Sequence, residues 1–151
     1  MRTKLDLEIK SAMKSQNKDR LSTLRLINAA IKDRDISVRS EENSQGVSDE
    51  TIVDILTQMI KQRNDSITHY EEAGRLELSE RENNEIFVIR EFLPKQLSDD
   101  EISTAIERVI AEEKATSIRD MGKVIGLLKR EYNGKVDFSK IGPLVKKLLL
   151  N

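Results

Sequence analysis

The sequence predicts an all-α protein in which a four-helix bundle is followed by a smaller three-helix bundle. Apolar residues recur three and four positions apart along almost the whole chain, which is the spacing of one face of an α-helix. No sustained alternation of apolar and polar residues, the pattern of a half-buried strand, is present. Pro94 ends the fourth helical segment, and we expect it to separate an N-terminal domain, residues 1–93, from a C-terminal domain, residues 94–151.

Four helices are expected in the N-terminal domain. The first runs from about Thr3 to Lys14, and the second begins after the polar break at 15–17 and reaches the mid-thirties. Residues 37–46 are polar and lack helical periodicity, so they predict a mobile surface loop. A long third helix follows this loop and is expected to end at Ala73.

Polar caps and one glycine mark the helix boundaries of this domain. Asn17 and Ser48 precede the second and third helices, where a side-chain oxygen can accept a hydrogen bond from a free backbone N–H. Gly74 is expected to stop the third helix in the left-handed conformation. Ser79 and Glu82 match a capping box, which predicts that the fourth helix opens at Ser79.

Three shorter helices are expected in the C-terminal domain. Ser98 and Glu101 form a second capping box at the start of the first of them. Ser117 is expected to cap the next helix, with Asp120 in its first turn, and Gly134 is expected to end it.

Pro143 leaves the path of the last helix open. If the helix begins after its expected cap, Asp137, the proline lies beyond the first turn and removes a backbone hydrogen bond. Alternatively, a separate turn at 138–141 precedes a helix in which Pro143 occupies the first position. The sequence is compatible with both arrangements.

The charge is distributed in blocks, although the formal net charge is only −1. Residues 1–40 carry +5, residues 41–93 carry −8, residues 94–118 carry −3 and residues 119–151 carry +5. Two basic ends therefore flank an acidic middle, which allows an anionic partner without requiring one.

Several classes of function lack the residues they require. The chain has no Cys, its one histidine is His69, and its six glycines are dispersed, so no thiolate site, hydrolase triad or phosphate-cradling loop is predicted. We predict no catalytic residue, no metal site and no cofactor. The charged N-terminus and the lack of any apolar run near ~20 residues predict a cytoplasmic protein without a membrane partner.

Five charged residues of the N-terminal domain are expected to interact. Arg25 and Arg63 lie on or next to apolar helix faces, where a half-buried guanidinium needs a carboxylate partner. Glu82 and Glu85 on the fourth helix are the expected partners, and Arg75 lies nearby in the sequence. We favour a structural ion-pair network over a ligand site as the role of this group.

The basic residues of the C-terminal end are the candidate RNA-binding surface. They are eight: Arg119, Lys123, Lys129, Arg130, Lys135, Lys140, Lys146 and Lys147. Acidic residues are scarce around them, and the Gly134–Lys135 pair predicts a flexible basic turn that can approach a phosphate backbone. The alternative is a solvated basic face that keeps the protein soluble. Aromatic residues are few here, so shape and phosphate recognition of a folded RNA fits better than stacking on single strands.

Motifs along the whole chain resemble those of the YqeY family. The segments that carry the resemblance are Leu24-Arg25 with Asn28-Ala29-Ala30; Arg63, Tyr70 and Ala73-Gly74-Arg75; Glu82 and Glu85; Phe92-Leu93-Pro94-Lys95-Gln96-Leu97-Ser98; Asp120-Met121-Gly122-Lys123-Val124; and Gly134-Lys135-Val136-Asp137. The C-terminal part is also similar to the tail domain of the B subunit of the bacterial Asp/Glu-tRNA amidotransferase, hence the name GatB/YqeY domain. The resemblance implies the same two helical bundles and makes Lys123 and Lys135 candidate tRNA contacts. Both the catalytic cradle of the B subunit and an amidase signature are missing from this chain.

Three functional hypotheses follow. The first is a non-catalytic, tRNA-amidotransferase-related protein that binds tRNA, possesses no activity of its own and works with a translation-related protein complex, with no DNA partner. The second is a protein-interaction adaptor. The third, which we favour least because no nucleophile is evident, is a carbon–nitrogen ligase with glutamine as the amido-nitrogen donor, acting within a complex.

Overall fold

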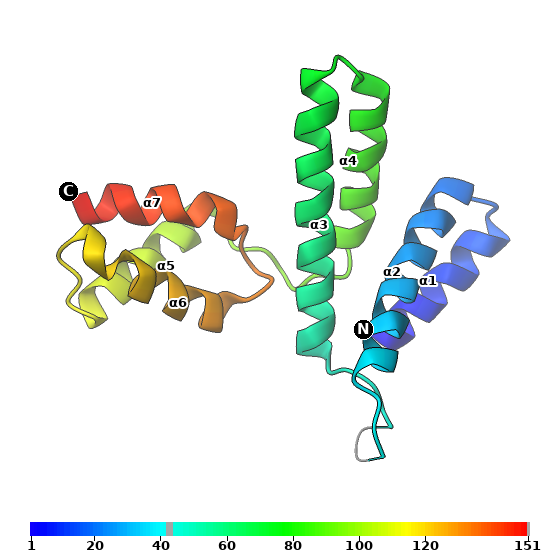
Figure 1. Cartoon of the computed structure of the whole chain (residues 1–151), viewed down its shortest axis with the longest axis horizontal. Helices are drawn as coiled ribbons and strands as arrows, with labels where there is room; N and C mark the ends of the chain where they lie inside the picture. The colour runs from blue at the N-terminus through cyan, green and yellow to red at the C-terminus, as the bar shows by residue number, and fades with distance from the viewer. Residues whose placement is uncertain (42–43, 151) are drawn as a thin grey trace. The chain divides into compact units, whose positions relative to one another are not determined.

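The computed structural model describes residues 1–41 and 44–150, and every regular element in these ranges is helical. The prediction of an all-α fold is therefore confirmed. The contacts between residues divide the chain into two compact units, Met1–Leu93 and Pro94–Asn151. Each unit has its own apolar core, and Figure 1 shows the helices of both.

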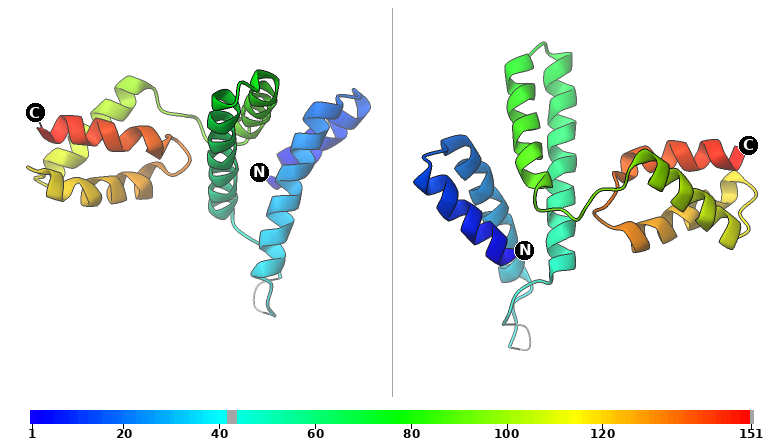
Figure 2. Two further views of the ribbon diagram at one scale, coloured as in Figure 1. Left: turned by 45° about the horizontal axis from the view of Figure 1, so that its top comes forward. Right: turned by 180° about the vertical axis from the view of Figure 1, so that it is seen from behind.

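Four helices build the N-terminal unit: α1 (Arg2–Lys14), α2 (Lys18–Ser37), α3 (Asp49–Glu72) and α4 (Leu76–Arg90). α1 pairs with α2, α3 pairs with α4, and α2 also packs against both α3 and α4. Both views of Figure 2 show α3 and α4 running antiparallel, side by side. The core is formed by apolar residues that all four helices contribute, with Leu24, Leu56 and Ile89 completely buried.

Three of the four expected helix boundaries of this unit, those marked by Asn17, Ser48 and Gly74, are confirmed. The Asn17 side chain accepts a hydrogen bond from the Arg20 N–H at 3.2 Å, and Ser48 Oγ accepts one from the Thr51 N–H at 3.3 Å. Gly74 has φ +70 after the end of α3, which is the left-handed region that glycine adopts without a steric cost.

The predicted start of the fourth helix was wrong. α4 begins at Leu76, so the chain resumes helix formation almost directly after Gly74. Ser79 is the fourth residue of α4 and is buried, and its hydroxyl lies 3.4 Å from a Glu71 carboxylate oxygen at the end of α3. Ser79 is not a cap, because it lies inside a helix that has already begun. Its hydroxyl instead links α4 to the end of α3 through Glu71.

The connection from α2 to α3 is anchored by Asp35 at the end that leads into α3. Two loop residues, 42 and 43, lie outside the described ranges. The Asp35 carboxylate accepts hydrogen bonds from Arg2 Nη1 and Nη2, both at 2.9 Å, and from the Val47 N–H at 2.8 Å. Gly46 has φ +85, and a Cβ there would lie 2.6 Å from an Asp35 oxygen. Glycine is therefore required where the loop turns back toward this carboxylate.

The C-terminal unit contains α5 (Asp99–Glu112), a short 3-10 turn η1 (Ile118–Asp120), α6 (Met121–Tyr132) and α7 (Phe138–Leu150). The three α-helices pack on one another, and their shared core is centred on Ile106, Val124 and Val145. The capping box of α5 is confirmed: the Glu101 N–H donates to Ser98 Oγ at 3.2 Å, and the Ser98 N–H donates to the Glu101 carboxylate at 3.4 Å.

Pro143 lies inside α7 as its sixth residue, and the helix is continuous on both sides of it. The alternative in which a separate turn precedes a later helix is therefore wrong. Proline has no N–H, so α7 lacks one backbone hydrogen bond at this point. The apolar face of α7 continues past the proline, since Ile141 and Val145 are both buried in the core of the unit.

Within the described residues, no helix has both the length and the apolar composition that a bilayer-spanning helix needs.

Candidate nucleic-acid interface

The core of the C-terminal unit determines which side chains of α6 face outward. Val124 and Leu128 are buried and lie on the inner side of this amphipathic helix. With 3.6 residues per turn, Lys123 and Arg130 then fall on the outer side, seven positions and about two turns apart. Lys129 is also exposed.

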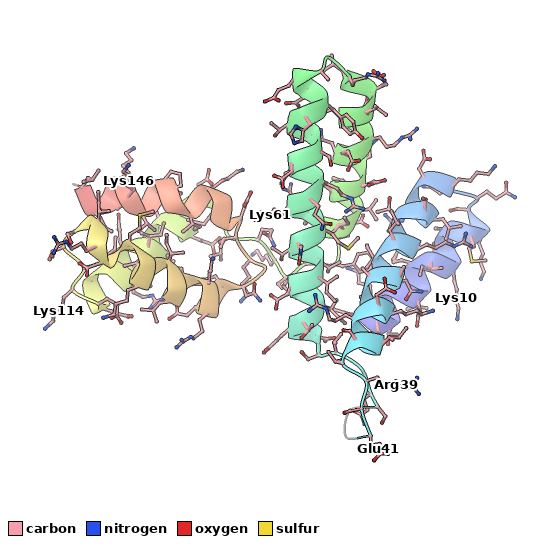
Figure 3. All side chains as sticks on the ribbon, in the orientation of Figure 1. Lys10, Arg39, Glu41, Lys61, Lys114 and Lys146 are labelled. Carbon is pink, nitrogen blue, oxygen red and sulfur yellow. The ribbon has the colours of Figure 1, made fainter. Side chains whose placement is uncertain are left out.

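All eight basic residues that the sequence singled out are exposed: Arg119, Lys123, Lys129, Arg130, Lys135, Lys140, Lys146 and Lys147. Arg119 belongs to η1, three of them to α6, three to α7, and Lys135 to the turn between α6 and α7. They do not form a single flat patch, because Figure 3 shows Lys146 extending from α7 on the side away from α6. The basic residues are therefore distributed around the unit.

Two exposed glycines lie among the basic residues of α6. A Cβ at Gly122 or at Gly126 would have no heavy atom within 4 Å, so the packing of the unit does not require glycine at either position. The two are four residues apart and share a side of the helix. With no side chains there, the helix backbone is open to approach between Lys123 and Arg130.

Lys123, a candidate tRNA contact, forms an ion pair. Its ammonium lies 2.9 Å from the Glu113 carboxylate, which raises the pKa of Lys123. The Lys123 side chain is 63% exposed, so water screens this pair, and such pairs contribute about 0–1 kcal/mol. A phosphate can therefore displace Glu113 at a small cost.

The acidic residues of the basic segment are occupied by other groups. Asp120 accepts hydrogen bonds from the Thr116 N–H at 3.0 Å and the Ser117 N–H at 3.3 Å, which lower its pKa. Glu131 pairs with Arg108, whose guanidinium also binds Glu112 at 2.9 Å. Asp120 also acts on Lys123 through its charge, whereas Glu131 is paired with an arginine of α5.

Arg108 organises a network that the sequence analysis missed. It joins α5 to α6 through Glu131 and lies 3.4 Å from the Tyr132 hydroxyl. The spacing of Arg108 and Glu112, four residues apart on one helix, was a visible signal for part of it. The contact with Glu131 crosses 23 positions of sequence, and no local pattern predicts it.

The turn between α6 and α7 is held in place, contrary to the expectation of a flexible turn. Gly134 is buried with φ +77, and its carbonyl accepts a hydrogen bond from Gln96 Nε2 at 2.6 Å. The Lys135 carbonyl accepts one from the Leu97 N–H, and the Lys135 N–H donates to the Tyr132 carbonyl, both at 2.9 Å. The segment after Pro94 thus fixes the backbone that carries Lys135, while its side chain stays exposed.

The structure brings together two of the five residues expected to form ion pairs. Arg63 Nε donates to the Glu85 carboxylate at 2.8 Å, and Arg63 Nη1 donates to the Met59 carbonyl at 3.1 Å. The side chain of Arg63 is only 13% exposed, so the pair is largely shielded from water. It connects α3 to α4.

The other three residues of this group lie apart. Arg25 is exposed on α2, which corrects the expectation that it is half buried, and Arg75 is exposed at the start of α4. Glu82 is half buried, and burial, followed by the nearby charge of Glu85, raises its pKa. Within the described ranges, neither arginine has an ion-pair partner.

A shallow pocket occurs on the C-terminal unit beside the Arg108 network. It has a volume of about 390 Å³ and is lined mainly by apolar atoms. Its lining residues are Leu97, Asp100, Glu101, Thr104, Ala105, Arg108 and Tyr132. In the part of the chain that the structure describes, no group of three or more His, Cys, Asp or Glu side chains is arranged to hold a metal ion.

The chain shares sequence with proteins of two yeasts. It is 31% identical over 88 residues to the uncharacterized protein C22F3.15 of Schizosaccharomyces pombe, covering 58% of this chain and 68% of that protein. It is 27% identical over 115 residues to the altered inheritance of mitochondria protein 41, mitochondrial, of Lachancea thermotolerans, covering 75% of this chain and 59% of that protein. The family model of the Yqey-like proteins matches residues 2–149. The chain therefore belongs to the YqeY family.

Proposed function

We propose that this protein is a non-catalytic tRNA-binding protein whose C-terminal unit contacts the phosphate backbone. The observation that carries the proposal is the set of eight exposed cations on residues 119–151, a segment that holds only three acidic residues. Each cation that neutralises a phosphate releases condensed counterions, and this release supplies most of the sequence-independent affinity for nucleic acids.

The geometry of the unit supports recognition of a folded RNA through its phosphates. The Tyr132 ring is half buried and its hydroxyl faces Arg108, so it is not a fully exposed platform for stacking on a base. The turn that carries Lys135 has a fixed backbone, and the α6 backbone is open at Gly122 and Gly126. A rigid, basic surface with few aromatic groups suits the grooves and phosphates of a double-stranded RNA.

The test is the salt dependence of tRNA binding by the full chain. A variant carrying Arg130→Gln, Lys135→Gln and Lys147→Gln removes three exposed cations from α6, the turn and α7. If each contacts one phosphate, the slope of log K against log salt concentration becomes shallower by about 2 to 3, and affinity in 0.15 M salt falls roughly 50- to 150-fold. A wild type that does not bind tRNA, or a variant with an unchanged slope, refutes the proposal.

A second candidate function, that of a protein-interaction adaptor, is favoured by the pocket on the C-terminal unit. Its apolar lining and the acidic rim residues Asp100 and Glu101 suit a partner segment that presents an apolar side chain next to a basic one. Affinity purification after nuclease treatment separates the two functions. One protein recovered in a stoichiometric amount favours the adaptor, and loss of all partners on nuclease treatment favours RNA.

We propose a cytoplasmic location for this chain, although the relative from Lachancea thermotolerans carries the word mitochondrial in its name. Fractionation of cells that produce the native protein tests this location directly.

A further inference from the structure

We infer that the outer face of α2 is a second RNA-binding surface, on the N-terminal unit. The inference rests on the proposed function, because that function supplies the class of partner. Lys18, Arg25 and Lys32 follow one another along α2 at intervals of seven residues. Seven residues make almost two helical turns, so the three side chains share one face and succeed one another at about 10 Å. We call this row of three cations the α2 stripe.

The core of the N-terminal unit holds the α2 stripe toward solvent. Ile27 and Ile31 are buried on the inner side of α2, as is Leu24. All three cations of the stripe are exposed. Because packing of the apolar side sets the rotation of the helix, the cations are presented on a rigid element and need no rearrangement to meet a ligand.

Arg25, the middle residue of the α2 stripe, has no acidic neighbour one turn away on the helix, and Asp35, three positions after Lys32, is bound by Arg2. The residues three and four positions from Arg25 are Leu21, Ser22, Asn28 and Ala29, all neutral. The described residues place no carboxylate within ion-pairing distance of any of the three cations. An ordinary solvated helix surface usually alternates both signs of charge, which this row does not.

Five acidic residues belong to α1 and α2 (Asp6, Glu8, Asp19, Asp33 and Asp35), and within the described residues none of them forms an ion pair with the α2 stripe. Asp35 is bound by Arg2, and Glu8 is bound by Arg20 at 2.8 Å. Asp19 and Asp33 adjoin stripe residues in sequence, yet adjacent residues point about 100° apart around a helix.

A phosphate backbone fits the α2 stripe better than an anionic membrane does. A helix that lies on a membrane buries a broad apolar face among the lipids, with cations on the opposite face. In α2 the broad apolar face packs into the protein core. The large apolar side chains of α2 that stay exposed are Leu26, with 44% of its surface accessible, and Ile36, with 69%. A straight row of cations beside small side chains such as Ser22 and Ala29 matches a linear polyanion.

The experiment compares two variants of the full chain that carry the same change of charge. The stripe variant combines Lys18→Gln, Arg25→Gln and Lys32→Gln. The control variant combines Lys61→Gln, Arg75→Gln and Arg90→Gln, three exposed cations of α3, α4 and the start of α4. tRNA binding is measured by fluorescence anisotropy over a range of salt concentrations, and urea unfolding confirms that both variants are folded.

We expect the stripe variant to show a salt slope shallower by about 2 to 3, with roughly 50- to 150-fold weaker binding in 0.15 M salt, and the control variant to lose only a few-fold. A single Arg25→Gln change, which leaves most of the charge in place, is expected to reduce the slope by about 0.7 to 0.9.

Two results overturn the inference while leaving the proposed function intact. In the first, tRNA binding by the wild type depends steeply on salt concentration, but the stripe variant behaves like the control variant. The second is a stripe variant that loses binding to vesicles of anionic phospholipid but not to tRNA, which assigns the α2 stripe to a membrane surface. Failure of the wild type to bind tRNA overturns the proposed function itself, so the two failures are distinguishable.

Discussion

Replacing Asp35 by Asn tests how the N-terminal unit fastens three of its segments together. The carboxylate accepts two hydrogen bonds from Arg2, at the start of α1, and one from the Val47 N–H, just before α3. Asp35 itself belongs to the last turns of α2. Asparagine has the same shape, but it removes the negative charge and puts an NH2 group, a donor, where one oxygen accepted from Arg2.

The expected loss of stability follows from the pKa of Asp35. The hydrogen bonds from Arg2, followed by the one from the Val47 N–H, lower this pKa from 3.8 to about 2. A shift of that size corresponds to about 2.4 kcal/mol between the folded and unfolded states. Because the Arg2 side chain is 41% exposed and that of Asp35 is 24% exposed, solvent screening reduces the contribution. We expect Asp35→Asn to cost about 1 to 1.5 kcal/mol at pH 7.

The dependence on pH distinguishes the charge from other effects of the substitution. The pKa of Asp35 is lower in the folded state, so the unfolded state binds the proton first as the pH falls. The stabilisation is therefore fully present above about pH 5 and is lost as the pH falls toward 2. Urea unfolding followed by circular dichroism at pH 7, 5, 4 and 3 should show a constant difference between wild type and variant down to about pH 5, and a smaller difference below it.

Asp33→Asn is the matched control, because Asp33 is an exposed aspartate on the same helix. We expect it to change the free energy of unfolding by less than about 0.5 kcal/mol. The reasoning is refuted if the two variants are equally stable at pH 7. It is also refuted if the difference between wild type and Asp35→Asn does not shrink between pH 5 and pH 3, since the charge of the carboxylate would then contribute nothing.

Four further substitutions test individual features of the two units, and each is checked by urea or thermal unfolding. Arg63→Ala leaves the half-buried Glu85 without its partner and should lower the free energy of unfolding by about 1.5 to 2 kcal/mol. The control Arg25→Ala, at an exposed position, should change it by less than about 0.5 kcal/mol. Equal effects of the two substitutions would contradict the burial of Arg63. Gly74→Ala places a Cβ at φ +70 and should destabilise the α3–α4 connection by about 1 to 2 kcal/mol, and a neutral result would rule out the left-handed turn. Gly126→Ala adds a methyl group that meets no other atom and should stabilise α6 by about 0.5 to 1 kcal/mol, so a loss of stability would reveal a contact there. Pro143→Ala restores the missing N–H of α7. After allowance for the greater freedom of the unfolded chain, it should stabilise the C-terminal unit by about 2 kcal/mol. A less stable variant would contradict a helix that is continuous through this position.

Local signals predicted the helical elements well, because they depend on residues that are close in sequence. Asn17, Ser48 and Ser98 each bond to a backbone N–H three residues away, and Gly74 adopts the backbone conformation that its own lack of a Cβ permits. The same kind of reasoning failed at Ser79. Ser79 and Glu82 match a capping box, but the tight turn at Gly74 lets α4 begin at Leu76, three residues before Ser79.

The candidate sites were predictable only in part. The exposure of the eight basic residues follows from the apolar periodicity of α6 and α7, which assigns them to the outer sides of these helices. Their role in binding tRNA remains a prediction. Arg25 illustrates the limit of this approach: a residue next to the buried Leu24 points about 100° away from it, and whether that direction leads to a neighbouring helix or to solvent depends on how the helices pack.

The amino-acid sequence by itself determined that this protein is helical, where most helices begin and end, which side of each helix is apolar and how charge is divided along the chain. These properties arise from the backbone preferences and periodicity of nearby residues. Only the tertiary structure decided that Arg63 meets Glu85, that Arg108 binds Glu131, and that Gln96 fixes the turn before Lys135. These partners are 22 to 38 residues apart, and only the packing of separate helices brings them into contact.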